Sequence, residues 1–159
     1  MVADLALLAA TLPAGLIAGL FYAYSCSVMP GLGGVDDRAL AGAMRSINTA
    51  ILNGWFALSF AGAPLLTAVA LALHLGDDQQ AALPWLAAAL GCCLATLAIT
   101  ARFNIPLNRE LAATSDSSSP AELATARARF ERPWARANHA RTLTSAAAFA
   151  CLTAALLVT

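Results

Sequence analysis

The chain has 159 residues and a formal net charge of zero; 60% of its residues are hydrophobic and only 11% are charged. Soluble domains contain about 45–50% apolar and about 25% charged residues, so this composition excludes an ordinary soluble domain and predicts an integral membrane protein. The length fits one domain, and the balanced charge gives no indication of a nucleic-acid partner.

Four runs are apolar and long enough to cross a lipid bilayer, which takes about 20 mostly apolar residues in a helix. They cover residues 5–29, 50–73, 81–101 and 142–159. No basic segment precedes the first run, so we expect a spanning helix there and not a cleaved signal peptide. Short connections then predict an all-α, up-and-down four-helix bundle that forms a single transmembrane domain over residues 1–159.

The connection after the first span contains a second helix signal. The sequence MPG at residues 29–31 is predicted to end the first spanning helix. Asp36 or Asp37 can cap a new helix, whose apolar residues recur at helical spacing: Leu40, Met44, Ile47 and Ile51. We therefore expect an amphipathic helix that leads directly into the second span.

The connection after the third span repeats this plan on a larger scale. Pro106 is predicted to interrupt the end of the span, and residues 114–120 (TSDSSSP) form a polar linker. Ser119 and Glu122 then match a capping box, with Pro120 at the first helical position. The similarity of VMPGL (28–32) to FNIPLN (103–108) raises the hypothesis of a parallel internal repeat.

All nine basic residues are arginines, and they border only two of the three connections. The connection HLGDDQQ (74–80) has two aspartates and no arginine. The positive-inside rule therefore predicts a multi-pass protein of the cell inner membrane with both arginine-bearing connections in the cytoplasm and both termini outside.

Polar and aromatic side chains gather at the arginine side of the expected bundle. They come from the end of the first span, the start of the second, the end of the third and the start of the fourth: Tyr24, Arg45, Asn48, Asn53, Trp55, Arg102, Asn104, Asn108, Trp134, Asn138 and Arg141. Trp134, Asn138 and Arg141 share one helical face.

These residues have an ordinary interpretation as well as a functional one. Arginine, tryptophan and tyrosine are usual at membrane interfaces, and Asn104 and Asn108 can satisfy carbonyl groups around Pro106. An amide inside a span, as expected for Asn53, needs a partner or a cavity. We predict that the side chains most in need of partners line one cavity: Asn48, Asn104, Asn138 and Arg141.

The sequence indicates no metal site. The cysteines lack the pair spacing of zinc ligands, and we expect them to pack inside the spans: Cys26, Cys92, Cys93 and Cys151. The two histidines cannot bind one metal together, because His74 is expected in the outer connection and His139 on the arginine side.

Four motifs in order resemble the anthrone-oxygenase-like family of small four-helix membrane proteins. They are FYAYSCSVMPGL (21–32), MRSINTAILNGWF (44–56), FNIPLN (103–108) and the W-x3-N-x2-R pattern of residues 134–141. The resemblance implies a cofactor-independent monooxygenase that converts anthrones to anthraquinones in aromatic polyketide biosynthesis. It also implies a flat, hydrophobic aromatic substrate at the cytoplasmic membrane interface.

Such a reaction needs an apolar slot, donors for a developing oxyanion and a base. We expect the oxyanion donors to be the catalytic residues Arg45, Asn48, Asn138 and Arg141. We expect the substrate to contact Tyr24, Asn53, Trp55, Asn104, Asn108 and Trp134. The base is not evident; a tyrosinate or a water held by asparagines would serve.

A different class of function stays open. The chain can be a non-enzymatic protein that binds a small hydrophobic ligand, or an accessory subunit, in which case the asparagines join helices and leave little cavity. A transporter fits less well, because no span carries a central acidic residue. Small residues on the first span, including Gly15 and Gly19, permit close contacts within the chain or in a homodimer.

Overall fold

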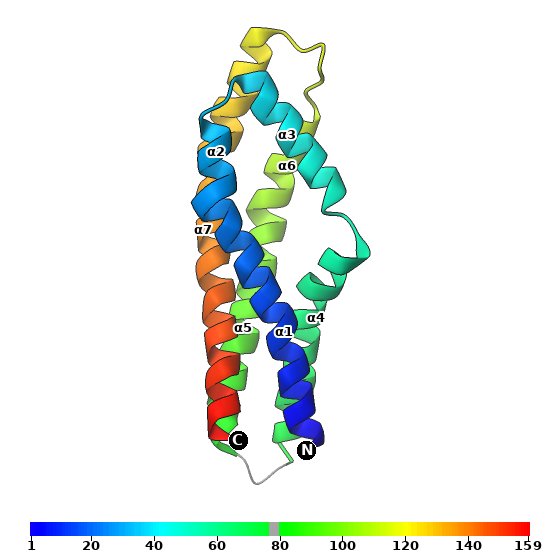
Figure 1. Ribbon diagram of the computed structural model, residues 1–159, viewed down its shortest axis with the longest axis vertical. Coiled ribbons are helices and arrows are strands. Elements are labelled where there is room, and N and C mark those ends of the chain that lie inside the picture. Colours follow the sequence, from blue (N-terminus) through cyan, green and yellow to red (C-terminus); the bar gives the residue numbers. More distant parts are fainter. Residues whose placement is uncertain (77–79) are drawn as a thin grey trace.

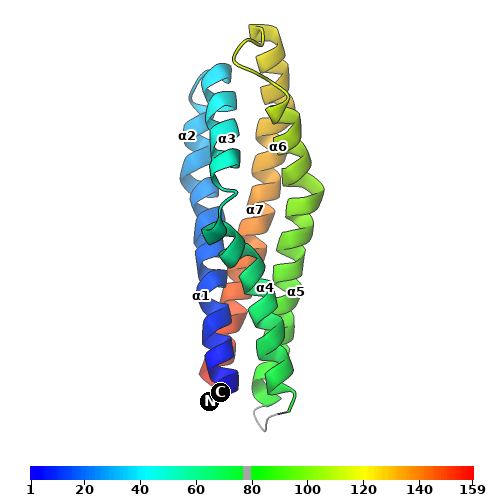
Figure 2. The same ribbon diagram turned by 90° about the vertical axis from the view of Figure 1, so that its right-hand side faces the viewer.

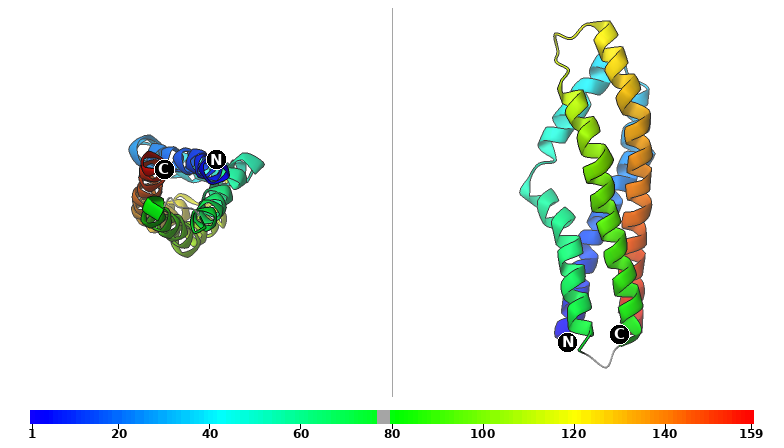
Figure 3. Two further views of the ribbon diagram at one scale, coloured as in Figure 1. Left: turned by 90° about the horizontal axis from the view of Figure 1, so that it is seen from below. Right: turned by 180° about the vertical axis from the view of Figure 1, so that it is seen from behind.

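The computed structural model describes residues 1–76 and 80–159, and all regular secondary structure in these ranges is helical. Figure 1 shows four long helices along the long axis: α1 (Val2–Ala23), α4 (Gly54–His74), α5 (Leu83–Ile99) and α7 (Pro120–Val158). Seen from below, they surround a common centre (Figure 3). Both chain termini lie at one end of the bundle, and we call the opposite end, which carries the arginine-bearing connections, the arginine end.

Four helical segments are long and apolar enough to cross a membrane: Val2–Gly33, Gly54–His74, Gln80–Ala112 and Pro120–Val158. The protein is therefore an all-α membrane helical bundle, which confirms the predicted fold class. Residues 77–79, with the two aspartates expected in the outer connection, lie outside the described residues. His74, expected in that connection, is instead the buried last residue of α4, with Nδ1 2.8 Å from the Ala70 carbonyl oxygen.

Two of these segments continue through a proline because a π-helical turn, which we call a widened turn, precedes it. The elements concerned are η1 (Tyr24–Val28), α2 (Met29–Gly33), η3 (Thr100–Asn104) and α6 (Ile105–Ala112). At the end of each widened turn a backbone N–H bonds to the carbonyl five residues back, Met29 to Tyr24 and Ile105 to Thr100. In a regular helix the proline ring clashes with the carbonyl four residues before it. The wider turn relieves that clash, so Pro30 and Pro106 do not end their helices as predicted.

The two halves of the chain share this plan of span, widened turn, proline helix and returning helix. They differ in the returning helix. In the first half it is split into α3 (Asp37–Ala50) and α4, whereas α7 runs unbroken through Pro133. The shared widened turns support the hypothesis of a parallel repeat. The two halves differ at the break between α3 and α4, which has no counterpart in α7.

The split between α3 and α4 forms an elbow at residues 51–53, which projects from the side of the bundle (Figures 1 and 3). Asn53 caps α4, because its Oδ1 accepts a hydrogen bond of 3.0 Å from the Phe56 N–H. Its Nδ2 donates to the Ala50 carbonyl at 2.8 Å. Asn53 therefore lies before the span, and the prediction of an amide inside the second span was wrong.

Beyond the elbow, α2, α3, α6 and the first half of α7 pack together at the arginine end (Figure 2). Their core consists of large side chains that are almost fully buried, among them Leu40, Met44, Leu111, Leu123 and Phe130. Burying one such side chain stabilises the fold by about 1.5–3 kcal/mol. The predicted capping box at the start of α7 is present, with both Ser119 and Glu122 bonds formed.

The spanning half has a core of smaller side chains, including Ala10, Ala14, Ala89 and Ala148. Small residues let the helix backbones approach closely. At Gly15 a Cβ atom would lie 3.0 Å from the Phe149 ring of α7, so part of the small-residue face is used within the chain. A homodimer remains a prediction.

Candidate functional site

A pocket of about 670 Å³ lies at the boundary between the spanning half and the arginine end. This volume is within the usual range for ligand sites, about 300–1,000 Å³. Its walls come from α1, η1, the α3–α4 elbow, the adjoining turns of α3 and α4, η3, α6 and α7. The split returning helix and both widened turns thus meet at the pocket. Widened turns of this kind are common at functional sites.

Seven of the ten residues predicted for the site line this pocket: Tyr24, Arg45, Asn48, Asn104, Asn108, Trp134 and Arg141. Asn53, Trp55 and Asn138 do not. Asn53 caps α4, and Trp55 is 83% exposed on the outside of the bundle. The predicted residues at the end of the third span line the pocket, as do Trp134 and Arg141 at the start of the fourth. Asn53 and Trp55 do not line it, because the elbow between α3 and α4 directs them away from the pocket.

Arg141 is the central cation of the pocket. Only 6% of its surface is exposed, and its Cζ lies 4.2 Å from the Phe21 ring centroid and 5.2 Å from that of Trp134. Its Nη2 donates to Asn138 Oδ1 at 2.8 Å, but its Nε has no hydrogen-bond partner in the described chain. A buried charge normally requires a counter-ion and full hydrogen bonding. The aromatic rings supply part of that stabilisation, and an anionic ligand would supply the rest.

Asn138 holds Arg141 in place from behind the pocket. It is fully buried, and its Nδ2 donates to the Phe21 carbonyl at 2.9 Å and to Ser25 Oγ at 2.8 Å. Its remaining acceptor takes the Arg141 bond. Asn138 therefore joins α7 to α1 and η1 and orients the Arg141 guanidinium. It was predicted to line the pocket, but it lies behind the lining and acts as a positioning residue.

Asn104 and Trp134 also line the pocket, from η3 and α7. Asn104 is 1% exposed, its Nδ2 lies 3.4 Å from the Trp134 carbonyl oxygen, and its Oδ1 has no hydrogen-bond partner in the described residues. Trp134 Nε1 donates to Asn108 Oδ1 at 2.8 Å, and its ring packs 5.5 Å from that of Tyr24. Within the described residues, the pocket thus combines an aromatic wall with a buried unpaired acceptor, Asn104 Oδ1, and a buried unpaired donor, Arg141 Nε.

Arg45 and Asn48 lie at the rim on α3. The Arg45 Nη1 donates to Thr114 Oγ1 at 2.9 Å, and its Nη2 is paired with the Asp116 carboxylate. Arg45 therefore anchors the polar linker to α3 and is less free than Arg141 to bind a ligand. No hydrogen bond of the Asn48 side chain is present within the described residues, so its amide is open to the pocket.

Sequence reasoning missed the apolar part of the lining, which includes three phenylalanines, Phe21, Phe56 and Phe60. It also missed the polar lining residues Thr100 and Arg109. The rings of Phe56 and Phe60 stack with centroids 5.0 Å apart, and Phe21 meets Phe60 edge-on at 6.2 Å. The spacing of Phe56 and Phe60 by four residues was the available signal. This spacing did not indicate a site, because apolar residues are expected everywhere in a span.

Within residues 1–76 and 80–159, no group of three or more histidine, cysteine or acidic side chains has a metal-binding arrangement. The four cysteines are free thiols, and their burial varies more than predicted, since Cys93 is buried and Cys26 is exposed.

The fold and the pocket define a multi-pass membrane protein with an aromatic-lined pocket near the arginine end of its bundle. The profile of the family described as anthrone oxygenase matches residues 53–151, and the chain belongs to this family. The matched range includes Asn104, Trp134 and Arg141, whereas Tyr24 and Arg45 lie before it. No curated protein and no solved structure matches the chain.

Proposed function

We propose that this protein is a membrane-embedded, cofactor-independent oxygenase that converts a flat, anthrone-like aromatic substrate to a quinone with O2. The observation that carries the proposal is the buried guanidinium of Arg141, which lines a pocket with an aromatic wall and whose Nε has no hydrogen-bond partner among the described residues. Such a group suits a ligand that becomes an anion during the reaction. Membership of the anthrone oxygenase family names the class of substrate.

The shape and polarity of the pocket support a hydroxylated, flat ligand. Tyr24, Trp134 and Phe21 present ring faces and edges, which suit a planar aromatic molecule. The unpaired Asn104 Oδ1 can accept a hydrogen bond from a phenolic hydroxyl group of the substrate. The unpaired Arg141 Nε–H can donate to the ketone oxygen.

The proposed reaction turns one anthrone and one O2 into one anthraquinone and one water. A base removes a proton from the activated CH2, and the resulting enolate places negative charge on the ketone oxygen. The enolate gives an electron to O2, and the two radicals combine to form a C–O bond. The peroxide anion takes up a proton. The carbon then loses its second hydrogen as a proton, the O–O bond breaks, and the departing hydroxide takes up that proton as water.

Arg141 stabilises the enolate in this scheme, and Asn138 holds Arg141 in position. Tyr24 is the group we assign to proton transfer, because no carboxylate or histidine is among the described lining residues. Its ring and the Arg141 guanidinium both pack against the Trp134 ring, at 5.5 and 5.2 Å from its centroid, so the phenol lies on the same side of the pocket as the cation. Asn48 and Arg45 would bind polar groups of the substrate at the rim.

Binding without turnover is the second candidate function. It is favoured by the same lack of a carboxylate or histidine in the lining. A binding protein or accessory subunit was expected to leave little cavity, because its asparagines would join helices. Asn138 does join helices, yet a pocket of about 670 Å³ remains beside it. Both candidates require a ligand in the pocket, and they differ in whether that ligand is oxidised.

The experiment is turnover of 1,8-dihydroxyanthrone by purified protein in lipid nanodiscs under ¹⁸O2. We expect quinone formation above the rate in empty nanodiscs, one O2 consumed per quinone, and one labelled oxygen in the product. Saturable binding without any rate above the empty nanodiscs would replace the oxygenase with the binding function. Absence of both binding and turnover would reject the two candidates for this class of substrate.

A further inference from the structure

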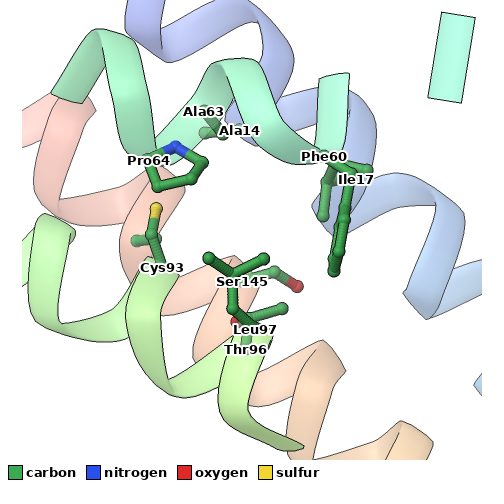
Figure 4. Close-up of a pocket in the computed structure, with 10 residues that line it drawn as sticks. Ala14, Ile17, Phe60, Ala63, Pro64, Cys93, Thr96, Leu97 and Ser145 are labelled. Atoms are coloured by element: carbon green, nitrogen blue, oxygen red, sulfur yellow. The ribbon is translucent and has the colours of Figure 1, made fainter. Parts of the chain in front are cut away.

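A second, much smaller cavity lies in the spanning half of the bundle. Its volume is about 20 Å³, and Figure 4 shows the side chains around it. All four spanning helices contribute, with Ala14 from α1, Ala63 from α4, Cys93 from α5 and Ala148 from α7. A cavity needs about 10–15 Å³ to hold one water molecule. This space is therefore slightly larger than one water molecule needs.

The polar atoms around the cavity are already engaged. Thr96 Oγ1 lies 3.0 Å from the Cys92 carbonyl oxygen, to which it donates, and 2.7 Å from Thr144 Oγ1. Ser145 Oγ donates to the Arg141 carbonyl at 2.7 Å. An ordered buried water typically makes about three hydrogen bonds, and the rest of the lining is apolar apart from a cysteine thiol. A small apolar molecule therefore suits this cavity better than water.

The cavity lies directly beneath the larger pocket. Ser145 follows Arg141 by one helical turn, Thr96 precedes Thr100 by one turn, and Phe60 lines both spaces. One turn of helix rises 5.4 Å. The edge-on pair of Phe21 and Phe60 stands at the junction, with ring centroids 6.2 Å apart. Phe60 is the residue that borders both the cavity and the pocket of Arg141.

We propose that this cavity binds O2 and supplies it to the substrate from the side of the membrane core. The proposal rests on the proposed function, since that reaction consumes O2. O2 is apolar and diatomic, so its transfer from water into an apolar cavity is favourable. O2 that comes from the bilayer through this cavity would reach the substrate past Phe60, which lines both spaces, without crossing the aqueous side.

Xenon is the probe, because it is a small apolar gas that needs no reaction to report its position. In xenon-pressurised crystals of the unaltered protein we expect one xenon among Ala14, Ala63 and Ala148. Ala63→Leu should abolish this site and raise the KM for O2 severalfold, with the KM for 1,8-dihydroxyanthrone unchanged. The matched control is Ala61→Leu on the exposed side of the same helix, which should change neither quantity.

A second variant guards against misfolding of Ala63→Leu. Cys93→Ala enlarges the cavity without crowding it, and we expect it to keep the xenon site at higher occupancy. Quinone formation without a xenon site, or with an unchanged KM for O2 in a folded Ala63→Leu protein, would overturn the cavity proposal and leave the oxygenase intact. A xenon site with no turnover of any hydroxyanthrone would overturn the proposed function, and with it O2 as the natural occupant.

Discussion

The guanidinium of Arg141 lies over the ring of Phe21, with Cζ 4.2 Å from the ring centroid. Neither residue would attract notice alone, because arginine is common near membrane boundaries and phenylalanine is common in spans. Together they place a cation inside the bundle where, within the described residues, no ion pair includes it. The proposed stabilisation of a substrate anion depends on this unpaired cation.

Arg141→Met tests the role of that charge. Methionine keeps much of the side-chain volume but cannot stabilise an oxyanion, so we expect kcat/KM for quinone formation to fall by about 10²–10³-fold. The control is Arg102→Met, which removes an exposed arginine whose Cζ lies 5.6 Å from the Phe103 ring centroid and which does not line the pocket. Equal rates for the two variants would show that Arg141 does not act on the substrate.

Asn138→Leu tests the positioning of Arg141. Leucine has a similar volume but leaves the Arg141 Nη2 without its acceptor and the Ser25 hydroxyl without its donor. We expect a loss of about 1–3 kcal/mol in the free energy of unfolding and a fall in kcat of about 10- to 100-fold, because the guanidinium is no longer held in place. The KM should change little.

A structural role alone would lower stability and leave the kcat of the folded fraction intact. Ser25→Ala is the matched control for Asn138. It removes one partner of the amide, since Asn138 Nδ2 lies 2.8 Å from Ser25 Oγ, but leaves the Arg141 bond in place. We therefore expect it to lower stability slightly and to preserve kcat.

Tyr24→Phe tests the assignment of proton transfer. The substitution keeps the ring that packs on Trp134 and removes the hydroxyl group. We expect kcat to fall by about 10²–10⁴-fold, while the affinity for 1,8-dihydroxyanthrone, measured under nitrogen, stays within a factor of about 2. Retention of kcat would assign the base to a water bound by the asparagines. Tyr22→Phe, on an exposed tyrosine of the same helix, is the control.

Much of the fold was predictable, because hydropathy over about 20 residues identifies spanning helices without any knowledge of their contacts. The shared face of Trp134, Asn138 and Arg141 followed from helical spacing. The elbow was not predicted, since a break of three residues between two apolar helices barely changes the hydropathy. Its signal was local: Asn53 followed by Gly54 is typical of a helix start.

Two other features depended on contacts that a sequence pattern does not encode. Pro30 and Pro106 were expected to end helices, but a widened turn before each proline lets the helix continue. Arg45 was predicted as a catalytic oxyanion donor, and in the structure the polar linker also folds back to it through Thr114 and Asp116. Residues 69 and 71 positions apart in sequence meet there.

The orientation in the membrane remains a prediction from the positive-inside rule. It can be measured with single cysteines in a variant whose four native cysteines are replaced by alanine or serine. A membrane-impermeant maleimide should label Thr159→Cys in intact cells and Ser117→Cys only after the cells are opened. The reverse pattern would place the arginine end outside and would move the pocket to the opposite membrane boundary.

The central claim is that Arg141 stabilises the anion of the substrate, and anaerobic titration of the protein with 1,8-dihydroxyanthrone tests it most directly. Without O2 the bound substrate cannot be oxidised, so its absorption spectrum reports whether it is neutral or an enolate. At a pH where the free compound is neutral, we predict an enolate spectrum on the unaltered protein and a neutral spectrum on Arg141→Met. A neutral spectrum on the unaltered protein, or the same enolate spectrum on both proteins, would contradict the account.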